Sequence, residues 1–112
     1  MQIKLPWPPS LNRYYRVWRN RTVISADGLR YRRDVVAATF GLPKMMGRLD
    51  MAIVMCAPDR RRRDVDNILK ATLDAMMHAG LYDDDSQIDR LSVVRGNSVS
   101  GGCLLVSLEV CK

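Results

Sequence analysis

Residues 60–67 read Arg-Arg-Arg-Arg-Asp-Val-Asp-Asn, so four cationic side chains stand directly before two carboxylates. Carboxylate oxygens suit Mg²⁺ and Mn²⁺ as ligands, and such a cation activates water and neutralises the charge that develops on a phosphate during hydrolysis. Asp64 and Asp66 are therefore candidate metal ligands. On a helix that begins at Asp64, the side chains of Asp66 and Lys70 lie about 40° apart. The pattern favours cleavage of a phosphodiester.

Each of these residues also has an ordinary structural interpretation. Asp64 is a suitable N-cap for a helix, and Asp66 with Lys70 would form a surface ion pair of little energetic value. The arginine run, which comprises Arg60, Arg61, Arg62 and Arg63, would then be a generic basic patch. Spacing alone does not decide between catalysis and these alternatives.

Two carboxylates are few for a divalent cation, and the acidic turn Asp83–Asp85 is the nearest source of a third. The predicted helix between them has about 15 residues and is about 22 Å long. Either the residues near 83–88 run back along that helix, or a second subunit supplies the third carboxylate. Taken alone, the acidic run is typical of a solvated turn.

Residues 12–19 read Asn-Arg-Tyr-Tyr-Arg-Val-Trp-Arg and alternate aromatic with arginine side chains. This alternation suits phosphate contact combined with base stacking. The alternative is that the rings fill the core. The candidates for contact with nucleic acid are Arg13, Tyr14 and Arg16 of this stretch, together with Arg60, Arg61, Arg62 and Arg63 of the arginine run.

Charge is distributed unevenly along the 112 residues, which carry 18 cationic and 12 acidic side chains for a net charge of +6. Residues 1–63 carry 14 positive and 4 negative charges, whereas residues 64–90 carry 2 positive and 7 negative charges. Fourteen of the cations are arginine, which binds phosphate bidentately, and eleven of the acids are aspartate. The balance predicts nucleic acid and a divalent cation as partners.

Other compositional features exclude several classes. His78 is the only histidine, which disfavours multi-histidine metal sites and two-histidine ribonuclease chemistry. The three cysteines, Cys56, Cys103 and Cys111, form neither an even disulfide set nor a C-x-x-C pair. The longest apolar run, residues 51–57, is far too short for a membrane span, and the first residues do not resemble a signal peptide. We expect a cytoplasmic protein with no membrane partner.

The first half of the chain predicts a strand over residues 2–6, ended by prolines. Residues 10–24 would form either a ragged hairpin or an ordered loop. Ser25 is a good N-cap for a helix that runs to about residue 40. The apolar stripe of this helix would consist of Leu29, Val36 and Phe40.

The second half begins with a nearly continuous apolar run, Leu49–Ala57, which predicts a central strand covered on both faces. A helix from Asp64 to the capping Gly80 follows, with apolar positions Val65, Leu69, Thr72, Met76 and Ala79.

The last third of the chain predicts two strands, over residues 88–95 and 104–110, joined by a hairpin connection at Asn97–Gly102. The order strand, helix, strand, helix, strand, strand predicts an α+β fold with a single mixed β-sheet packed with two main helices. We expect one domain over residues 1–112.

Four stretches, in this order and at this spacing, closely resemble the RusA family of Holliday-junction endonucleases. They are Leu-Pro-Trp-Pro-Pro-Ser at 5–10, Asn-Arg-Tyr-Tyr-Arg at 12–16, Pro-Asp-Arg-Arg-Arg-Arg-Asp-Val-Asp-Asn at 58–67 and Asp-Asp-Ser-Gln at 84–87.

The resemblance implies a homodimer of bacterial or prophage origin that depends on Mg²⁺, with Mn²⁺ as a substitute. Such an enzyme nicks two opposed strands of a four-way DNA junction in recombination and repair. Matched by motif, Asp64, Asp66 and Asp85 would bind the metal, Lys70 would be a catalytic cation, and Arg63 would contact a phosphate near the cut.

Two other classes remain open. One is a non-catalytic, structure-selective DNA-binding protein that uses the same arginine-rich face. The other is a nuclease for flaps or for RNA. Cleavage of an immobile junction, compared with duplex and single strands with and without Mg²⁺, separates the three.

Overall fold

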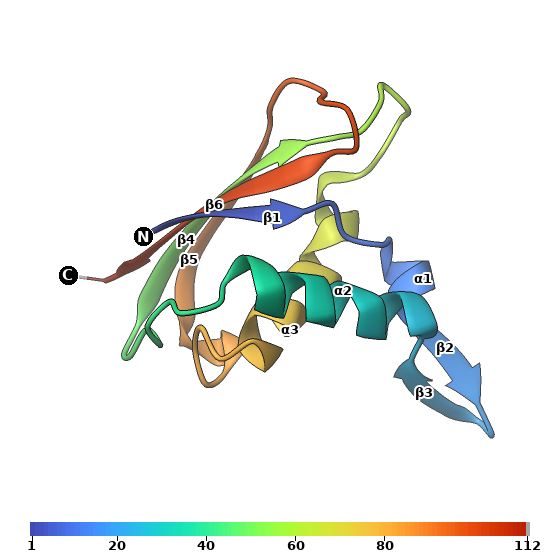
Figure 1. Ribbon diagram of the computed structural model, residues 1–112, viewed down its shortest axis with the longest axis horizontal. Coiled ribbons are helices and arrows are strands. Elements are labelled where there is room, and N and C mark those ends of the chain that lie inside the picture. The colour runs from blue at the N-terminus through green and yellow to red at the C-terminus, as the bar shows by residue number, and fades with distance from the viewer. Residues whose placement is uncertain (112) are drawn as a thin grey trace.

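A four-stranded mixed sheet forms one layer of the protein in the computed structural model, which describes residues 1–111 (Figure 1). The strands, in spatial order, are β1 (Gln2–Pro6), β6 (Cys103–Val110), β4 (Leu49–Cys56) and β5 (Ile88–Arg95). β4 pairs in parallel with β5 and antiparallel with β6, and β6 pairs antiparallel with β1.

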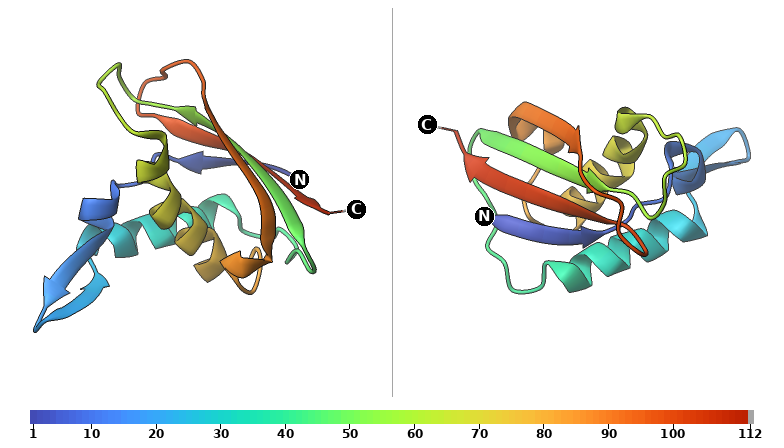
Figure 2. Two further views of the ribbon diagram at one scale, coloured as in Figure 1. Left: turned by 180° about the vertical axis from the view of Figure 1, so that it is seen from behind. Right: turned by 90° about the horizontal axis from the view of Figure 1, so that it is seen from above.

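Two main helices, α2 (Ala26–Ala38) and α3 (Leu69–His78), lie on one side of this sheet (Figure 2). The predicted α+β class, with a mixed sheet and two main helices, is confirmed. No helix in residues 1–111 combines the length and the apolar character that a membrane crossing requires.

β4 occupies the interior of the sheet, as its apolar run predicts. Met51, Ile53 and Met55 point into the core and are at most 2% exposed, whereas Ala52 between them is exposed. The prediction of a strand covered on both faces is therefore wrong for the isolated chain. The physical reason is that both helices pack on the same side of the sheet.

The loop between β5 and β6 is not a hairpin connection, so that prediction is also wrong. β4 lies between the two strands, and the loop crosses the end of β4. The Gly96 amide donates to the Met55 carbonyl at 2.9 Å, and the Val99 amide donates to the Ala57 carbonyl at 3.0 Å. The apolar β4 thereby gains a hydrogen-bonded partner along each edge.

α2 begins at the predicted cap, because the Ser25 hydroxyl accepts a hydrogen bond from the Gly28 amide at 3.0 Å. Its core-facing side consists of Gly28, Tyr31 and Val35. The Tyr31 hydroxyl donates to the Pro6 carbonyl at 2.8 Å, which fixes this side of the helix against the end of β1.

The predicted apolar stripe of α2 is consequently wrong. With Tyr31 and Val35 turned inward, the other apolar side chains of the helix face solvent, and Phe40, just beyond the helix, is 89% exposed. The exposed set comprises Leu29, Val36 and Phe40.

The second predicted helix starts as a 3₁₀ turn, η1 (Val65–Ile68), and continues as α3. Thr72 and Met76 are buried, as predicted from their spacing. Gly80 follows the helix with φ +85°, a conformation that favours glycine and ends the helix. A second 3₁₀ turn, η2 (Asp85–Gln87), leads into β5.

A short helix, α1 (Leu11–Tyr14), leads into a hairpin that projects from the body of the protein (Figures 1 and 2). The hairpin consists of β2 (Tyr15–Trp18) and β3 (Arg21–Ile24), and we call residues 15–24 the arm. The two turn residues, Arg19 and Asn20, both have positive φ, as a tight two-residue hairpin requires. Of the two structures predicted for this segment, the hairpin is the correct one.

Candidate active site

Asp64 and Asp66 lie where the arginine-rich loop enters η1, and both are exposed. Asp64 occupies the N-cap position, yet its side chain makes no capping hydrogen bond. Within residues 1–111 neither carboxylate forms an ion pair. The two carboxylates are therefore free to bind a ligand, and Asp64 is the N-cap by position although its carboxylate takes no part in capping.

Lys70 lies on the first turn of α3 and is exposed. The 3₁₀ turn advances about 120° per residue, so Asp66 and Lys70 are about 80° apart around the axis rather than about 40°. No ion pair joins them. The interpretation of Asp66 and Lys70 as a surface ion pair is thus not supported, and the exposed Lys70 amine forms no ion pair with any residue of 1–111.

Asp59 organises the arginine-rich loop that precedes this turn. Its carboxylate accepts hydrogen bonds from the Arg63 guanidinium at 2.7 Å and from the Arg61 amide at 2.9 Å. The hydrogen bond from Arg63, followed by that from Arg61, lowers the pKa of Asp59 to about 2. Arg63 also lies over the Trp7 ring, at 5.6 Å from its centroid.

The arginines of the loop therefore differ in how accessible they are to a phosphate. Arg63 is held by Asp59 and Trp7, so a phosphate must compete with these contacts to reach it. Arg61 is exposed and lies 3.6 Å from Asp59. Arg60 and Arg62 are exposed, which suits them to phosphate contact from solution.

The three aspartates of the acidic turn have different environments. Asp83 pairs with Lys44 at 2.6 Å. Asp84 accepts a hydrogen bond from the Ser86 amide at 2.9 Å, as part of a capping box at η2, and this contact lowers its pKa. Asp85 forms no ion pair within residues 1–111, which leaves it as the aspartate best able to bind a cation.

The structure does not bring Asp85 to the carboxylate pair of the same chain. β5 does run back toward the arginine-rich loop, because the Arg95 guanidinium donates to the Arg63 carbonyl at 2.6 Å. Asp85, however, precedes the opposite end of this strand, and Ile88–Arg95 spans about 23 Å. No group of three His, Cys, Asp or Glu side chains suited to a metal ion forms within residues 1–111.

The arm and its root supply a second basic surface. Arg13 is exposed and pairs with Asp27 at 3.0 Å, and Arg16 lies 5.5 Å from the centroid of the Trp18 ring. Tyr14, by contrast, is fully buried, so the prediction that its ring contacts nucleic acid is wrong. Its hydroxyl faces Asp74, and a base cannot stack on a ring enclosed in the core.

Three further arm residues are exposed: Trp18 and Arg19, which belong to the alternating stretch 12–19, and Arg21, which lies just outside it. Trp18 is 50% exposed and has the Arg19 guanidinium 5.2 Å from its ring centroid. The Arg19-Asn20 pair is the signal that could have located the tip, because Asn tolerates positive φ in two-residue turns.

These parts define a class of protein. An exposed pair of carboxylates, an exposed amine on the helix that follows and two arginine-rich surfaces are groups with which an enzyme can bind a nucleic-acid backbone and cleave its phosphodiesters. Comparison with known proteins identifies the family. Residues 6–108 match the family model described as Endodeoxyribonuclease RusA, and the chain belongs to the RusA family.

Named relatives agree with this assignment. The chain is 43% identical over 110 residues to a protein of Enterobacteria phage HK97 named crossover junction endodeoxyribonuclease rusA, with 96% of this chain and 92% of the relative covered. A protein of the same name from Enterobacteria phage 82 is 43% identical over 95% of this chain and 91% of its own. The crossover junction endodeoxyribonuclease RusA of Escherichia coli strain K12 is 42% identical, with 95% and 91% covered.

Proposed function

We propose that this chain is a Mg²⁺-dependent, structure-selective endodeoxyribonuclease that resolves four-way DNA junctions as a homodimer, by paired nicks in opposed strands. The observation that carries the proposal is the exposed, unpaired carboxylate pair Asp64 and Asp66 beside the arginine-rich loop. The names of the relatives support a crossover junction as the substrate.

The donor set fits a hard divalent cation. Asp64 leaves its carboxylate oxygens uncommitted at the entrance to η1, and Asp66 offers a second pair of oxygens two residues later. When bound there, Mg²⁺ or Mn²⁺ would activate water for attack and neutralise charge on the phosphate. Binding of Mn²⁺ to the DNA-free protein, measured by electron paramagnetic resonance, should weaken in Asp66→Asn.

The chain's own cations have separate tasks in this scheme. Lys70 places a positive charge beside the carboxylates, where it stabilises negative charge that develops on the phosphate. The exposed arginines of the loop and of the arm hold backbone phosphates on either side of the cut. The free amine and the free carboxylates thus act on one phosphodiester, while the arginines determine which one.

A homodimer gives the site its third carboxylate as well as its second cut. Because Asp85 lies at the far end of β5 from the carboxylate pair of its own chain, we infer that Asp85 of a second subunit joins Asp64 and Asp66. A two-fold dimer then contains two identical composite sites. This arrangement matches the two strands that a resolving enzyme must cut.

The first experiment compares an immobile four-way junction with a flap, a duplex, a single strand and an RNA duplex, with and without Mg²⁺. We expect cleavage of the junction with Mg²⁺ only. Asp66→Asn should slow cleavage by at least ~10²-fold while junction binding holds or strengthens, because repulsion of phosphate is relieved. Cleavage by Asp66→Asn at the parental rate would refute the assignment of the site.

The second experiment tests the composite site. Asp66→Asn and Asp85→Asn should each be inactive as homodimers. If the site is shared between subunits, mixed dimers of the two variants contain one intact site and one doubly altered site, and they should nick a cruciform plasmid without linearising it. If each site lay within one chain, both sites of the mixed dimer would be damaged and no nicking would return. Asp83→Asn, which alters the aspartate paired with Lys44, is the matched control and should remain active.

A further inference from the structure

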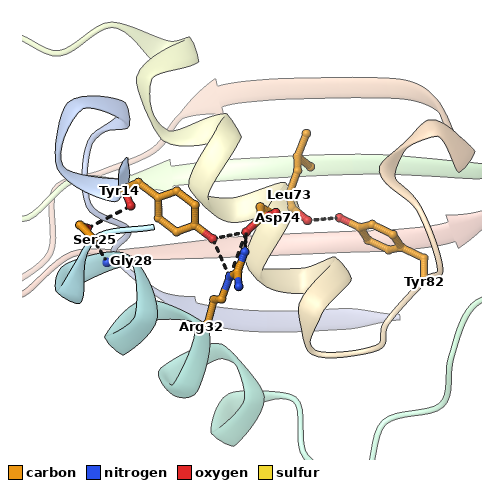
Figure 3. A network of polar contacts seen from close by, with 7 residues as sticks. All are labelled: Tyr14, Ser25, Gly28, Arg32, Leu73, Asp74 and Tyr82. Carbon is orange, nitrogen blue, oxygen red and sulfur yellow. Dashed lines mark hydrogen bonds and ion pairs between the residues drawn. The ribbon is translucent and has the colours of Figure 1, made fainter. Parts of the chain in front are cut away.

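A partly buried polar cluster joins α1, α2 and α3 (Figure 3). The Tyr14 hydroxyl, from α1, donates a hydrogen bond to the Asp74 carboxylate on α3. Arg32, from α2, donates to the same carboxylate oxygen through Nη2 at 2.7 Å and through Nε at 3.1 Å. The Tyr14 side chain is fully buried, and those of Arg32 and Asp74 are 22% and 14% exposed.

The Tyr14 hydroxyl of the cluster stays protonated. Burial, and next the hydrogen bond to Asp74, raise the pKa of Tyr14 well above its ordinary value. The hydroxyl therefore remains a donor throughout the working pH range. The partly buried Asp74 carboxylate accepts hydrogen bonds from both a hydroxyl and a guanidinium. Loss of either donor leaves the remaining polar groups partly desolvated without a full set of hydrogen bonds, which costs free energy.

Tyr14 is also the root of the arm. It is the last residue of α1 and directly precedes β2, while Ser25 directly follows β3. The Ser25 amide and hydroxyl both donate to the Tyr14 carbonyl at 3.0 Å, so the two ends of the arm close on this residue. The exposed Arg13 and Arg16 stand on either side of the buried root.

α1, which ends in this root, contacts η1 and α3 on both sides of Lys70. Asp74 follows Lys70 by four residues, so the two side chains lie on the same face of α3, one turn apart. Before Lys70, the Leu11 amide donates to Asn67 Oδ1 at 3.4 Å, next to Asp66. α1 is thus joined to the segment that carries Asp66 and Lys70 by the Tyr14–Asp74 hydrogen bond and by the longer bond from Leu11 to Asn67.

We propose that Asp74, together with Tyr14 and Arg32, is a positioning residue for strand cleavage: the cluster fixes the arm against the helix that carries Lys70, so that DNA held by the arm presents its phosphate to Asp64 and Asp66. This inference rests on the proposed function. It assigns no contact with DNA to the three residues themselves.

The test uses Tyr14→Phe, which removes one hydroxyl and keeps the ring. Tyr31→Phe is the matched control, because it also removes a buried hydroxyl that donates to a single acceptor, the Pro6 carbonyl, outside the cluster. Cleavage of pre-bound junction under single-turnover conditions should slow by about 10-fold in Tyr14→Phe, since small misplacements of reacting groups are costly. The junction Kd without Mg²⁺ should stay within about twofold, and Tyr31→Phe should cleave at the parental rate.

Hydrogen exchange of the DNA-free protein supplies a readout that is independent of activity. In Tyr14→Phe, amides of both the arm and α3 should exchange faster, whereas Tyr31→Phe should not accelerate the two together. Asp74→Asn, which keeps an acceptor for Tyr14 but removes the ion pair with Arg32, should reproduce both effects.

Equal slowing of cleavage in Tyr14→Phe and Tyr31→Phe would overturn the proposal, as would a loss confined to Kd. If the parental protein cuts no junction, the proposed function fails. In that case exchange that accelerates in the arm alone would refute the coupling of the arm to α3, and joint acceleration would support it.

Discussion

Replacement of Gly28 by alanine should stabilise α2 through helix propensity but destabilise the folded protein through steric overlap with a neighbouring segment. Gly28 lies in the first turn of α2, and alanine is a better helix former than glycine by about 1 kcal/mol. A Cβ at this position, however, would lie 2.5 Å from the Tyr14 carbonyl oxygen and 2.9 Å from Ile24 Cγ2. The close backbone oxygen belongs to the root of the arm, so relief of the overlap requires α1 or α2 to move.

The change in the free energy of unfolding follows from the steric overlap and the gain in helix propensity. Overpacking of this kind costs about 1–3 kcal/mol, and displacement of the Tyr14 carbonyl also weakens its hydrogen bond from the Ser25 amide. After subtraction of the gain in helix propensity, Gly28→Ala should lower the free energy of unfolding by about 1–2 kcal/mol. For a domain of this size, Tm should fall by about 4–8 °C.

Thermal and urea unfolding followed by circular dichroism measure the change. Ala37→Gly, at an exposed position of the same helix, is the control and should cost about 0.5–1 kcal/mol through helix propensity alone. A Gly28→Ala protein that is more stable than the parent would show that the arm does not approach α2 this closely. That outcome would contradict the close contact between α2 and the Tyr14 carbonyl.

Three further outcomes are expected. Arg16→Ala and Arg61→Ala should each flatten the slope of log affinity against log salt for junction DNA by about one unit, and unchanged slopes would place the DNA surface elsewhere. Because the pKa of Asp59 is lowered to about 2 in the folded protein, its contribution to stability is present above the unfolded value of 3.8 and is lost as pH falls toward 2. Asp59→Asn should therefore lower Tm at pH 5 and differ less from the parent near pH 2. Burial raises the pKa of the Cys56 thiol, so it should react with a disulfide reagent at pH 8 much more slowly than Cys111 does, and equal rates would contradict the buried position of Cys56 at the end of β4.

Sequence by itself determined the features that depend on neighbouring residues. The Ser25 cap, the Gly80 stop and the alternation of Leu104, Val106 and Leu108 all act within a few positions of the chain, and the structure agrees with each. Asp64 and Asp66 were recognisable as a candidate site for the same reason, since both carboxylates and the preceding arginines are contiguous.

Only the tertiary structure decided which groups are free and which are committed. Asp83, Asp84 and Asp85 are chemically identical in sequence, and they differ because Lys44 and the Ser86 amide engage the first two. Tyr14 and Asp74 stand 60 positions apart in the chain, so no local pattern places that ring in the core.

The strand order and the choice of the buried face of α2 also depend on tertiary contacts. β4 separates β5 from β6, and Tyr31 rather than Leu29 faces the core, because burial is shared among segments that meet only after folding. Helix caps and hydrophobic periodicity depend on interactions among residues that are close in sequence. Pairing, burial and the separation of Asp85 from Asp64 depend on the whole chain, because every one of them is set by contacts between segments distant in sequence.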